Sequence, residues 1–519
     1  MKAVSQNSHR LSATGCRLAV AVLCLTLLLS GCRTNFPPLE ESRPEDGSSF
    51  DSSFSDGTSN SWGGGVSGET TGNTAGNTTG TNEDNASEPT TSTDGSDTGT
   101  TSTATDGNTT TGSHTTADTT PSTSPAPAPG GYTPLNYGTM KACWLSQFDM
   151  LNIYMLNIYK VNGRQRDQAD FTARVEQIFD NLCTRAINTV IVQVRPYADS
   201  FYPSEYFPWS NYVTGSHNVE GTYDPLAIMV EAAHERGLSI HAWINPMRGM
   251  TSAQITDVGS QYPMRQWYND TAKRGKYIVE WSDGANKRWY LNPAYPEVRK
   301  LIADGAAEIV RNYDIDGIHM DDYFYPTTSA AFDESAYLQF GSGMTLTNFR
   351  YSNTNALVRE IYQAVKAVNS QVLFGVSPAG NVTNNLTVYY ADVTEWCTSS
   401  GYMDYISPQV YWGMEHTTHD FVKISRQWNQ MISPSSGVKL VIGMTLEKAS
   451  THPSSEPEWG KYTDVIKRCM ESLSSLNHCS GVSLFSYQFL FDPLTGAVNS
   501  STKAEVDNFL GVLQNMNFG

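Results

Sequence analysis

Residues 313–326, YDIDGIHMDDYFYP, are the stretch of this sequence that says most about its fold. A short strand-like run ends here in two adjacent carboxylates. Alternation places Ile318 and Met320 on one face of that strand, and His319 and Asp321 on the other. An apolar outer face and a polar inner face are typical of a barrel strand whose carboxyl end opens into a cleft.

Short apolar runs and amphipathic helical patterns alternate on both sides of this stretch. The expected strands are 142–148, 188–195, 238–244, 316–321, 372–377, 404–410, 438–444 and 481–487. The expected helices are 171–183, 225–236, 296–313, 353–368, 390–400, 420–430, 461–476 and 502–513. This order predicts the α/β class and a (β/α)₈ barrel, with an open doubly wound sheet as the alternative. Long aromatic-rich loops after several strands favour the barrel.

The N-terminal residues have the features of an export signal. Lys2, Arg10 and Arg17 precede an apolar run, 18–29, which is too short to span a bilayer because a spanning helix needs about 20 residues. The Leu-Ser-Gly-Cys that ends at Cys32 is similar to a bacterial lipobox. We therefore expect 1–31 to be a lipoprotein signal peptide. Cys32 would then carry the lipid, and would anchor the chain to the extracytoplasmic face of the cell membrane. An ordinary signal peptide with an incidental cysteine is the alternative.

We expect residues 32–131 to form a disordered tether between the anchor and a folded domain at 132–519. The segment is rich in Ser, Thr, Gly, Asn and Asp, and it has too few apolar residues to offset the entropy of ordering. Residues 1–39 carry a charge of +4, residues 40–131 carry −13, and the remainder carries −9. Nucleic acid is excluded as a partner, because its binding depends on Lys and Arg.

Cysteine usage and the known sequence motifs exclude several classes of site. Five cysteines follow the tether without CxxC spacing, so we expect neither a disulfide framework nor a cysteine zinc site. Cys469 and Cys479 are either a pair or buried free thiols. Outside the predicted tether, the sequence contains no HExxH, GxSxG, Walker or GxGxxG motif. We therefore expect no metal or cofactor, and a monomeric domain.

Asp321 and Asp322 are the candidate catalytic residues. Two adjacent carboxylates in a barrel mouth suit acid–base chemistry, because like charge and burial raise the pKa of one while the other stays ionised. The alternative is an Asp pair that only holds the loop by hydrogen bonds.

Polar side chains also follow the second and third strands. Gln193 and Arg195 share the inward phase of one strand, Asn245 lies in that of the next, and Arg248 follows it. A buried arginine is costly unless it is paired. We therefore expect Arg195 to face a carboxylate such as Asp321, either as a structural ion pair or as a substrate contact.

The sixth strand contributes Gln409 and Tyr411 on one side, followed by Trp412. Trp412, Trp243 and Trp144 are either platforms on which a sugar stacks or core side chains. The residues expected to bind substrate are Gln193, Arg195, Asn245, Arg248, His319, Gln409, Tyr411 and Trp412.

Together these motifs resemble the bacterial glycosyl hydrolase-like family 10 lipoproteins. The stretches that carry the resemblance are 190–209 (VIVQVRPYADSFYPSEYFPW), 223–248 (ending HAWINPMR), 291–293, 313–326, 374–378 and 404–412. The resemblance implies a (β/α)₈ glycosidase, and some members of the family cleave peptidoglycan strands whose stem peptides have been removed. Met247 and Met320 depart from the pattern, since bulkier aromatic residues are expected there, and the fifth strand lacks a carboxylate.

Two functions from different classes remain open. One is a cell-surface glycoside hydrolase that cleaves O-glycosyl bonds in peptidoglycan-type or related polysaccharide. The other is a non-catalytic carbohydrate-binding lipoprotein of the cell envelope.

A second carboxylate across the cleft would discriminate between them, at about 5–5.5 Å for retention or 6.5–9.5 Å for inversion. The candidates are Asp149, Glu205, Glu415 and Glu447. If the glycan carries N-acetyl groups, its acetamido oxygen can attack the anomeric carbon in place of a protein carboxylate. One Asp would then be the general acid, and its neighbour would orient the acetamide.

Overall fold

The computed structural model of the chain describes residues 131–146, 156–282, 287–321, 324–493 and 495–518. The predicted signal peptide, Cys32 and the predicted tether lie outside these residues. Among the described helices, none combines the length and the apolar character that crossing a membrane requires.

Eight parallel strands form a closed barrel in the order β1, β12, β11, β10, β9, β8, β5, β4, with β1 pairing β4 to close the ring. The strands are β1 (Met140–Leu145), β4 (Thr189–Arg195), β5 (Ser239–Ile244), β8 (Gly317–Met320), β9 (Leu373–Val376), β10 (Tyr405–Ile406), β11 (Lys439–Thr445) and β12 (Cys479–Phe485). The predicted (β/α)₈ barrel is confirmed, and the open sheet is excluded.

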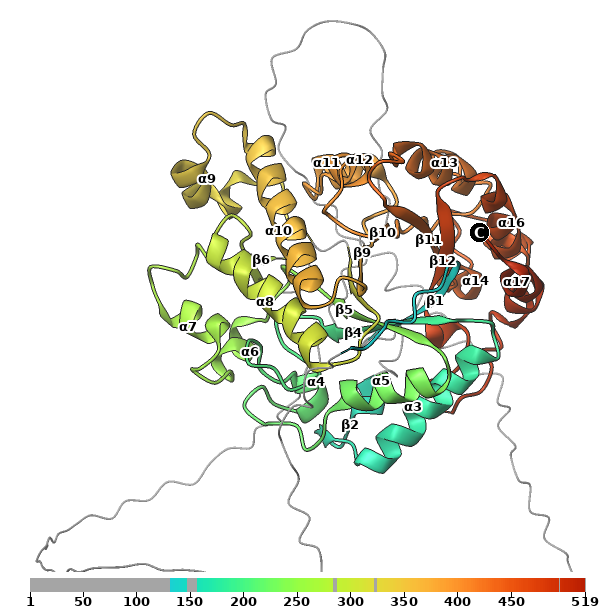
Figure 1. Cartoon of the computed structure of the whole chain (residues 1–519), viewed down its shortest axis with the longest axis horizontal. Helices are drawn as coiled ribbons and strands as arrows, with labels where there is room; N and C mark the ends of the chain where they lie inside the picture. Colours follow the sequence, from blue (N-terminus) through green and yellow to red (C-terminus); the bar gives the residue numbers. More distant parts are fainter. Residues whose placement is uncertain (1–130, 147–155, 283–286, 322–323, 494, 519) are drawn as a thin grey trace, which may run out of the picture. The chain divides into compact units, whose positions relative to one another are not determined.

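Each of the eight predicted helices is present, and Figure 1 shows them around the strands. They are α3 (Gln168–Cys183), α5 (Pro225–Glu235), α8 (Pro296–Asn312), α10 (Leu346–Val368), α12 (Val393–Thr398), α13 (Phe421–Met431), α16 (Val465–Ser472) and α17 (Lys503–Asn515). Helix α10 begins earlier than predicted, because the Thr345 side chain accepts a hydrogen bond from the Asn348 amide and caps the helix there.

The sixth strand is shorter than predicted. Regular pairing covers only β10, whereas the alternating pattern extends to Val410. Pro408 lacks a backbone N–H and so interrupts the ladder. Beyond it, Gln409 makes isolated bridges to Ala379 and Gly443.

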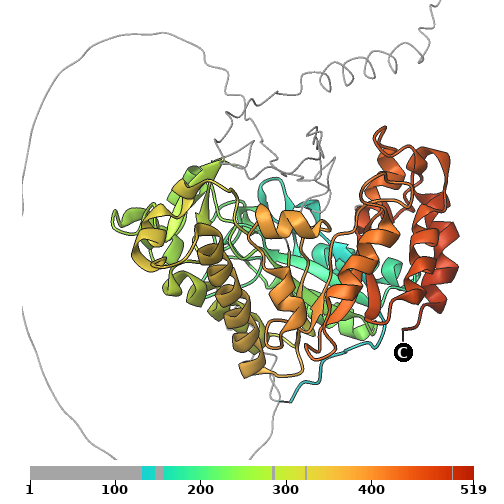
Figure 2. The ribbon, with the colours of Figure 1, turned by 90° about the horizontal axis from the view of Figure 1, so that it is seen from above.

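The loops that follow the strands carry additional elements. They are α2 (Leu156–Tyr159), β2 (Lys160–Val161), β3 (Arg164–Gln165), α4 (Asn211–Thr214), α6 (Ser252–Thr256), α7 (Pro263–Asn269), β6 (Ile278–Ser282), β7 (Lys287–Leu291), η1 (Ala330–Phe332), α9 (Glu334–Phe340), α11 (Val382–Thr387), α14 (Glu447–Thr451), α15 (Glu458–Lys461), η2 (Leu473–Ser475) and η3 (Tyr487–Phe489). The insertions after β5 and β8 lie together on one flank of the barrel, in green and yellow in Figure 2, where Trp281 contacts Phe332.

The barrel has two hydrophobic cores, one on each face of its strands. The larger core lies between strands and helices and includes Ile318 and Met320. The smaller core fills the lumen with Met140, Ala142, Trp144, Ile191, Trp243, Tyr405 and Val441. Residues that alternate along a strand therefore separate between the two cores, as the pattern in 313–326 predicts.

Asp316 lies at the base of the barrel, the end opposite the carboxyl ends of the strands. Its buried carboxylate accepts hydrogen bonds from Tyr132 Oη at 2.7 Å, the Leu135 amide at 2.6 Å and the Ile240 amide at 2.7 Å, and it contacts His234 Nε2 at 3.0 Å. Segment 132–135 is thereby attached to the base of the barrel.

Candidate active site at the carboxyl ends of the strands

A row of hydrogen bonds crosses four neighbouring strands where they end. Ser146 Oγ, just beyond β1, donates to Gln193 Oε1 on β4 at 3.5 Å, and Gln193 Nε2 donates to Asn245 Oδ1 at 2.8 Å. Asn245 Nδ2, just beyond β5, lies 2.7 Å from each carboxylate oxygen of Asp321. All four side chains are buried. Asp321, which directly follows β8, is therefore held in the barrel mouth by the neighbouring strands.

His319 lies one layer below Asp321, in the lumen. Tyr405 Oη is 2.7 Å from His319 Nδ1 and 2.8 Å from His241 Nδ1. Burial lowers the pKa of His241 to about 4, and it lowers that of His319 well below its usual value. Both imidazoles are therefore neutral at neutral pH, and the predicted inward orientation of His319 is confirmed.

Trp144 and Trp243 form the aromatic part of this layer. Their rings meet edge to face, with centroids 4.7 Å apart, and Trp144 also contacts His319 at 4.6 Å. Trp144 is 1% exposed and Trp243 is 5% exposed. Of the two sequence-level interpretations of these tryptophans, the core role is the one that the structure favours.

Asp322 and Asp149 lie outside the described residues. The pairing of Asp322 with Asp321 in catalysis therefore stays a prediction.

Arg195 does not face Asp321, so the predicted partner is wrong. Burial lowers the pKa of Arg195, and the charge of a different carboxylate, Glu308, opposes that effect. The register between β4 and β5 shifts between Gln193 and Arg195. A bulge of this kind turns the following side chain to the other face of the sheet. The guanidinium stacks on Phe207 at 4.4 Å and donates to the carbonyl of Ile302 on α8 at 3.4 Å. Arg195 therefore packs between barrel and helix.

Arg248 belongs to a cationic and aromatic cluster above β4 and β5. Its guanidinium lies 4.8 Å from the ring centre of Tyr197, and Arg288 of β7 lies 4.1 Å from the same ring. Both arginines are buried. Sequence reasoning missed Arg288, because nothing local indicates that the β6–β7 hairpin folds onto the loop after β5.

The residues predicted after the sixth strand lie on the other side of the mouth. Gln409 is half-buried and donates to the Ser377 carbonyl at 3.3 Å, and half-buried Tyr411 lies 6.0 Å from Phe485 between ring centres. Trp412 is 8% exposed, and one of its faces is stacked on His419 at 4.8 Å.

Of the described candidates for a second carboxylate, Glu447 has the most suitable position. It is the first residue of α14, two positions beyond β11, and burial raises its pKa. Glu205 is exposed beside α8, where its amide binds Glu308. Glu415 is exposed and lies 3.9 Å from Lys461.

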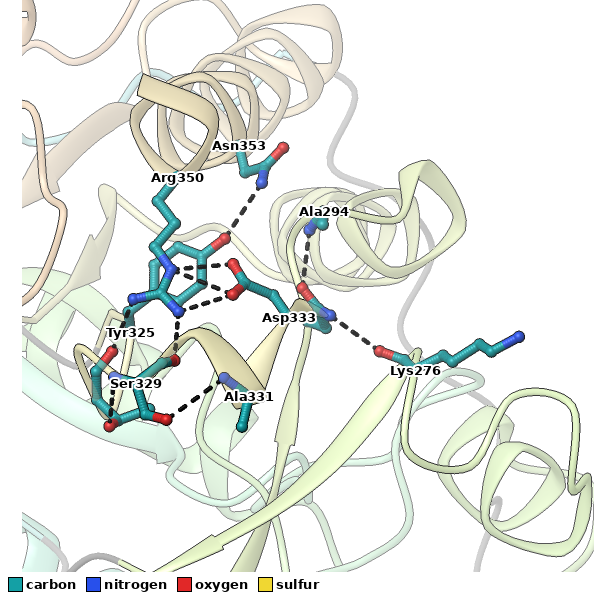
Figure 3. A network of polar contacts seen from close by, with 10 residues as sticks. Lys276, Ala294, Tyr325, Ser329, Ala331, Asp333, Arg350 and Asn353 are labelled. Carbon is teal, nitrogen blue, oxygen red and sulfur yellow. Dashed lines mark hydrogen bonds and ion pairs between the residues drawn. The ribbon is translucent and has the colours of Figure 1, made fainter. Parts of the chain in front are cut away.

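The loop that follows Asp321 is fixed further along by a polar network (Figure 3). Arg350 on α10 donates to both carboxylate oxygens of Asp333 at 2.7–3.2 Å. It also donates to the carbonyls of Thr327 at 3.1 Å and Ser329 at 2.6 Å. This side chain therefore holds residues 327–333 against α10.

The described residues hold no group of three or more His, Cys, Asp or Glu side chains placed to bind a metal ion. Cys469 and Cys479 are both free and buried, and burial raises the pKa of each thiol. The interpretation of these two residues as free thiols is confirmed.

Comparison with known proteins identifies the family. The model of the family described as glycosyl hydrolase-like 10 matches residues 139–461. This chain belongs to the glycosyl hydrolase-like 10 family. The match begins at β1 and ends at α15, so it leaves out β12, the strand that pairs with both β1 and β11 to close the barrel.

Curated relatives carry the name glycosyl hydrolase. The chain is 33% identical to glycosyl hydrolase YngK of Bacillus subtilis (strain 168), over 59% of this chain and 62% of that protein, which is less than two thirds of the relative's length. It is 30% identical to glycosyl hydrolase DigH of Escherichia coli O6:H1 (strain CFT073), over 69% of this chain and 84% of that protein.

Among solved structures, the chain is similar to the glycoside hydrolase domain of PgaB (BpsB) from Bordetella bronchiseptica. The two are 12% identical with a TM-score of 0.44, over 72% of this chain and 99% of that one.

Proposed function

We propose that this member of the glycosyl hydrolase-like 10 family is a glycoside hydrolase of the cell surface, acting on peptidoglycan-type or related glycan. The observation that carries the proposal is the buried Asp321 carboxylate, which Asn245 holds in the barrel mouth. Catalytic groups of (β/α)₈ enzymes lie at this end of the barrel.

In this proposal Asp321 and Asp322 carry the chemistry, and Gln409, Tyr411 and Arg248 contact the sugar. A general acid must be protonated before it can protonate the leaving oxygen. Glu447 suits that role, because burial raises its pKa. If the substrate carries an N-acetyl group, its acetamido oxygen attacks the anomeric carbon and an Asp orients it.

The test is incubation of the full chain, purified in detergent, with peptidoglycan strands stripped of stem peptides, and with mass spectrometry of the products. The Asp321→Asn variant is the control. New reducing ends with wild type and none with the variant support the proposal. Strand binding without turnover by wild type indicates the non-catalytic carbohydrate-binding lipoprotein instead.

We also propose that Cys32 is lipidated and attaches the chain to the cell membrane. The support is the order of a basic segment, an apolar run and Leu-Ser-Gly-Cys at residues 1–32. The polar segment from 33 to 131 would have an r.m.s. span of about 55 Å as a flexible chain. That reach suits a catalytic domain that works within a layer of wall polymer.

A further inference from the structure

The hydrogen-bond row at the mouth has only one consistent direction when Asp321 is ionised. An ionised carboxylate only accepts hydrogen bonds, so Asn245 must present its NH₂ group to it. The Asn245 oxygen then faces Gln193, which must present its own NH₂ group. The Gln193 oxygen in turn faces Ser146, whose hydroxyl donates. The charge state of one carboxylate thus sets the orientation of both amides.

Burial makes this orientation difficult to reverse. Asn245 is 2% exposed, Gln193 is 5% exposed and Asp321 is 2% exposed. An acceptor turned toward another acceptor at this depth keeps its full desolvation cost. The carboxylate and the amides therefore act as a single unit.

We propose that Gln193 and Asn245 are positioning residues, which hold Asp321 as an anionic hydrogen-bond acceptor in one orientation. This replaces the substrate-binding role that the sequence suggested for them, and it rests on the proposed function. Asp321 then supplies negative charge at the reacting centre, where it stabilises positive charge or orients an acetamide. The proton for the leaving group comes from a different side chain.

The other titratable and charged groups on the described strands around Asp321 behave differently. His319 on β8 and His241 on β5 have lowered pKa values and stay neutral at neutral pH. Tyr405 on β10 has a pKa well above its usual value, and Arg248 after β5 stays cationic. Strand β9 carries no ionisable side chain. A shift in the acidic limb of the rate profile therefore reports on the catalytic carboxylates, Asp321 and Asp322, and not on these groups.

The decisive variant is Gln193→Glu, which keeps the shape of the side chain and removes its N–H donor. The new carboxylate and the Asn245 oxygen then face each other, unless Asn245 turns its oxygen toward Asp321. In either arrangement two oxygen acceptors face each other, and the repulsion is relieved only when one of the carboxylates binds a proton. We expect kcat to fall by about 10- to 100-fold, since small errors in catalytic geometry cost this much. We expect the acidic limb to move upward by about one pH unit or more, with KM unchanged.

Two further variants complete the test. Gln193→Met removes donor and acceptor together, so we expect a smaller loss of kcat, about threefold to tenfold, again with KM unchanged. The matched control is Asn188→Asp at the opposite end of β4. There Asn188 Nδ2 donates to the Thr139 carbonyl at 2.9 Å and Oδ1 accepts from the Lys141 amide at 2.8 Å. That change should leave the pH profile as in wild type.

The outcomes separate this inference from the proposed function. If Asp321→Asn is inactive while Gln193→Glu keeps the wild-type kcat and pH profile, the positioning role is wrong and the glycosidase proposal stands. A raised KM with unchanged kcat in Gln193→Glu indicates a substrate contact and also overturns the inference. Full activity of Asp321→Asn would overturn both the positioning role and the assignment of Asp321 as a catalytic residue. If Gln193→Glu does not fold, an unaltered kcat in Gln193→Met overturns the positioning role.

Discussion

Arg350 and Asp333 form an ion pair in which neither side chain is exposed to solvent, and the closest N–O contact between them is 2.7 Å. Arg350 also lies over the rings of Tyr325, at 4.9 Å, and Tyr390, at 4.6 Å. The pair joins the loop after β8 to helix α10 (Figure 3). The buried Arg350 guanidinium, with its several acceptors, therefore holds this loop in place. Its role is structural and distinct from that of the catalytic candidates at the start of the loop.

Replacing Arg350 with Met leaves the Asp333 carboxylate buried without its cation. We expect the free energy of unfolding to fall by about 3–5 kcal/mol, measured by urea denaturation. Lys300→Met is the matched control, since Lys300 and Asp304 form an exposed pair whose loss should cost less than about 1 kcal/mol. Equal costs for the two variants would contradict the structural role given to Arg350.

Two aspartates at opposite ends of β8 should differ in the property that they control. Asp321→Asn should lower kcat by about 100-fold or more, since the loss of one group that stabilises transition-state charge costs about 10²–10³ in kcat, with little change in unfolding free energy. Asp316→Asn, at the base of the barrel, should lower stability and leave kcat near wild type. Denaturation curves and glycan turnover measured on both variants check this. A stable, fully active Asp321→Asn enzyme would rule out the assignment.

Glu447→Gln tests the proposed general acid. The amide cannot donate a proton to the leaving oxygen, so we expect kcat on glycan strands to fall by about 100-fold or more. A substrate whose leaving group needs no protonation, such as a nitrophenyl glycoside, should restore much of the rate. Glu415→Gln, an exposed carboxylate, is the control and should be as active as wild type. Equal losses on both kinds of substrate would exclude Glu447 as the acid.

Glu505 on α17 should make the domain less stable as pH rises. Its buried carboxylate accepts a hydrogen bond from the Ile466 amide at the start of α16, and burial raises its pKa from 4.5 to about 7. Between these values the folded chain keeps a proton that the unfolded chain has lost. The free energy of unfolding therefore declines through this window and stays lower above it.

The Glu505→Gln variant keeps the acceptor without the charge. It should gain about 1–3 kcal/mol over wild type above pH 7, with no gain below about pH 4.5. Glu471→Gln on α16 is an exposed control. His241 acts in the opposite sense, because its pKa of about 4 removes stability as pH falls from 6.5. His241 contributes equally to the unfolding free energy of the variant and of wild type, so its contribution cancels in the difference between them. A difference independent of pH would refute the effect.

Cys32→Ala tests the proposed anchor. Without a thiol the chain cannot be acylated at this position, so we expect it to move from the membrane fraction to the soluble fraction. Cys16→Ala, within the predicted signal peptide, is the matched control and should leave the chain with the membrane. Retention of Cys32→Ala in the membrane would contradict the lipobox interpretation.

The sequence alone determined the elements and the phase of most inward side chains. Each barrel strand and each main helix was predictable, because period-2 and period-3.6 hydrophobic patterns are local. The same alternation put His319 and Asp321 in the lumen and Ile318 and Met320 outside it. The inward orientation of Tyr405 could also have been predicted, because Tyr405 shares the inward phase of the sixth strand.

Only the tertiary structure decided what those side chains meet. The bulge after Gln193 reverses the direction of Arg195, and it depends on the register between two strands. The β6–β7 hairpin brings Arg288 to Tyr197, and the pairing of β1, β4, β5 and β8 lines up Ser146, Gln193, Asn245 and Asp321. Strand register and loop packing depend on contacts between residues that are distant in the sequence. A local hydrophobic pattern does not encode which strands pair with each other.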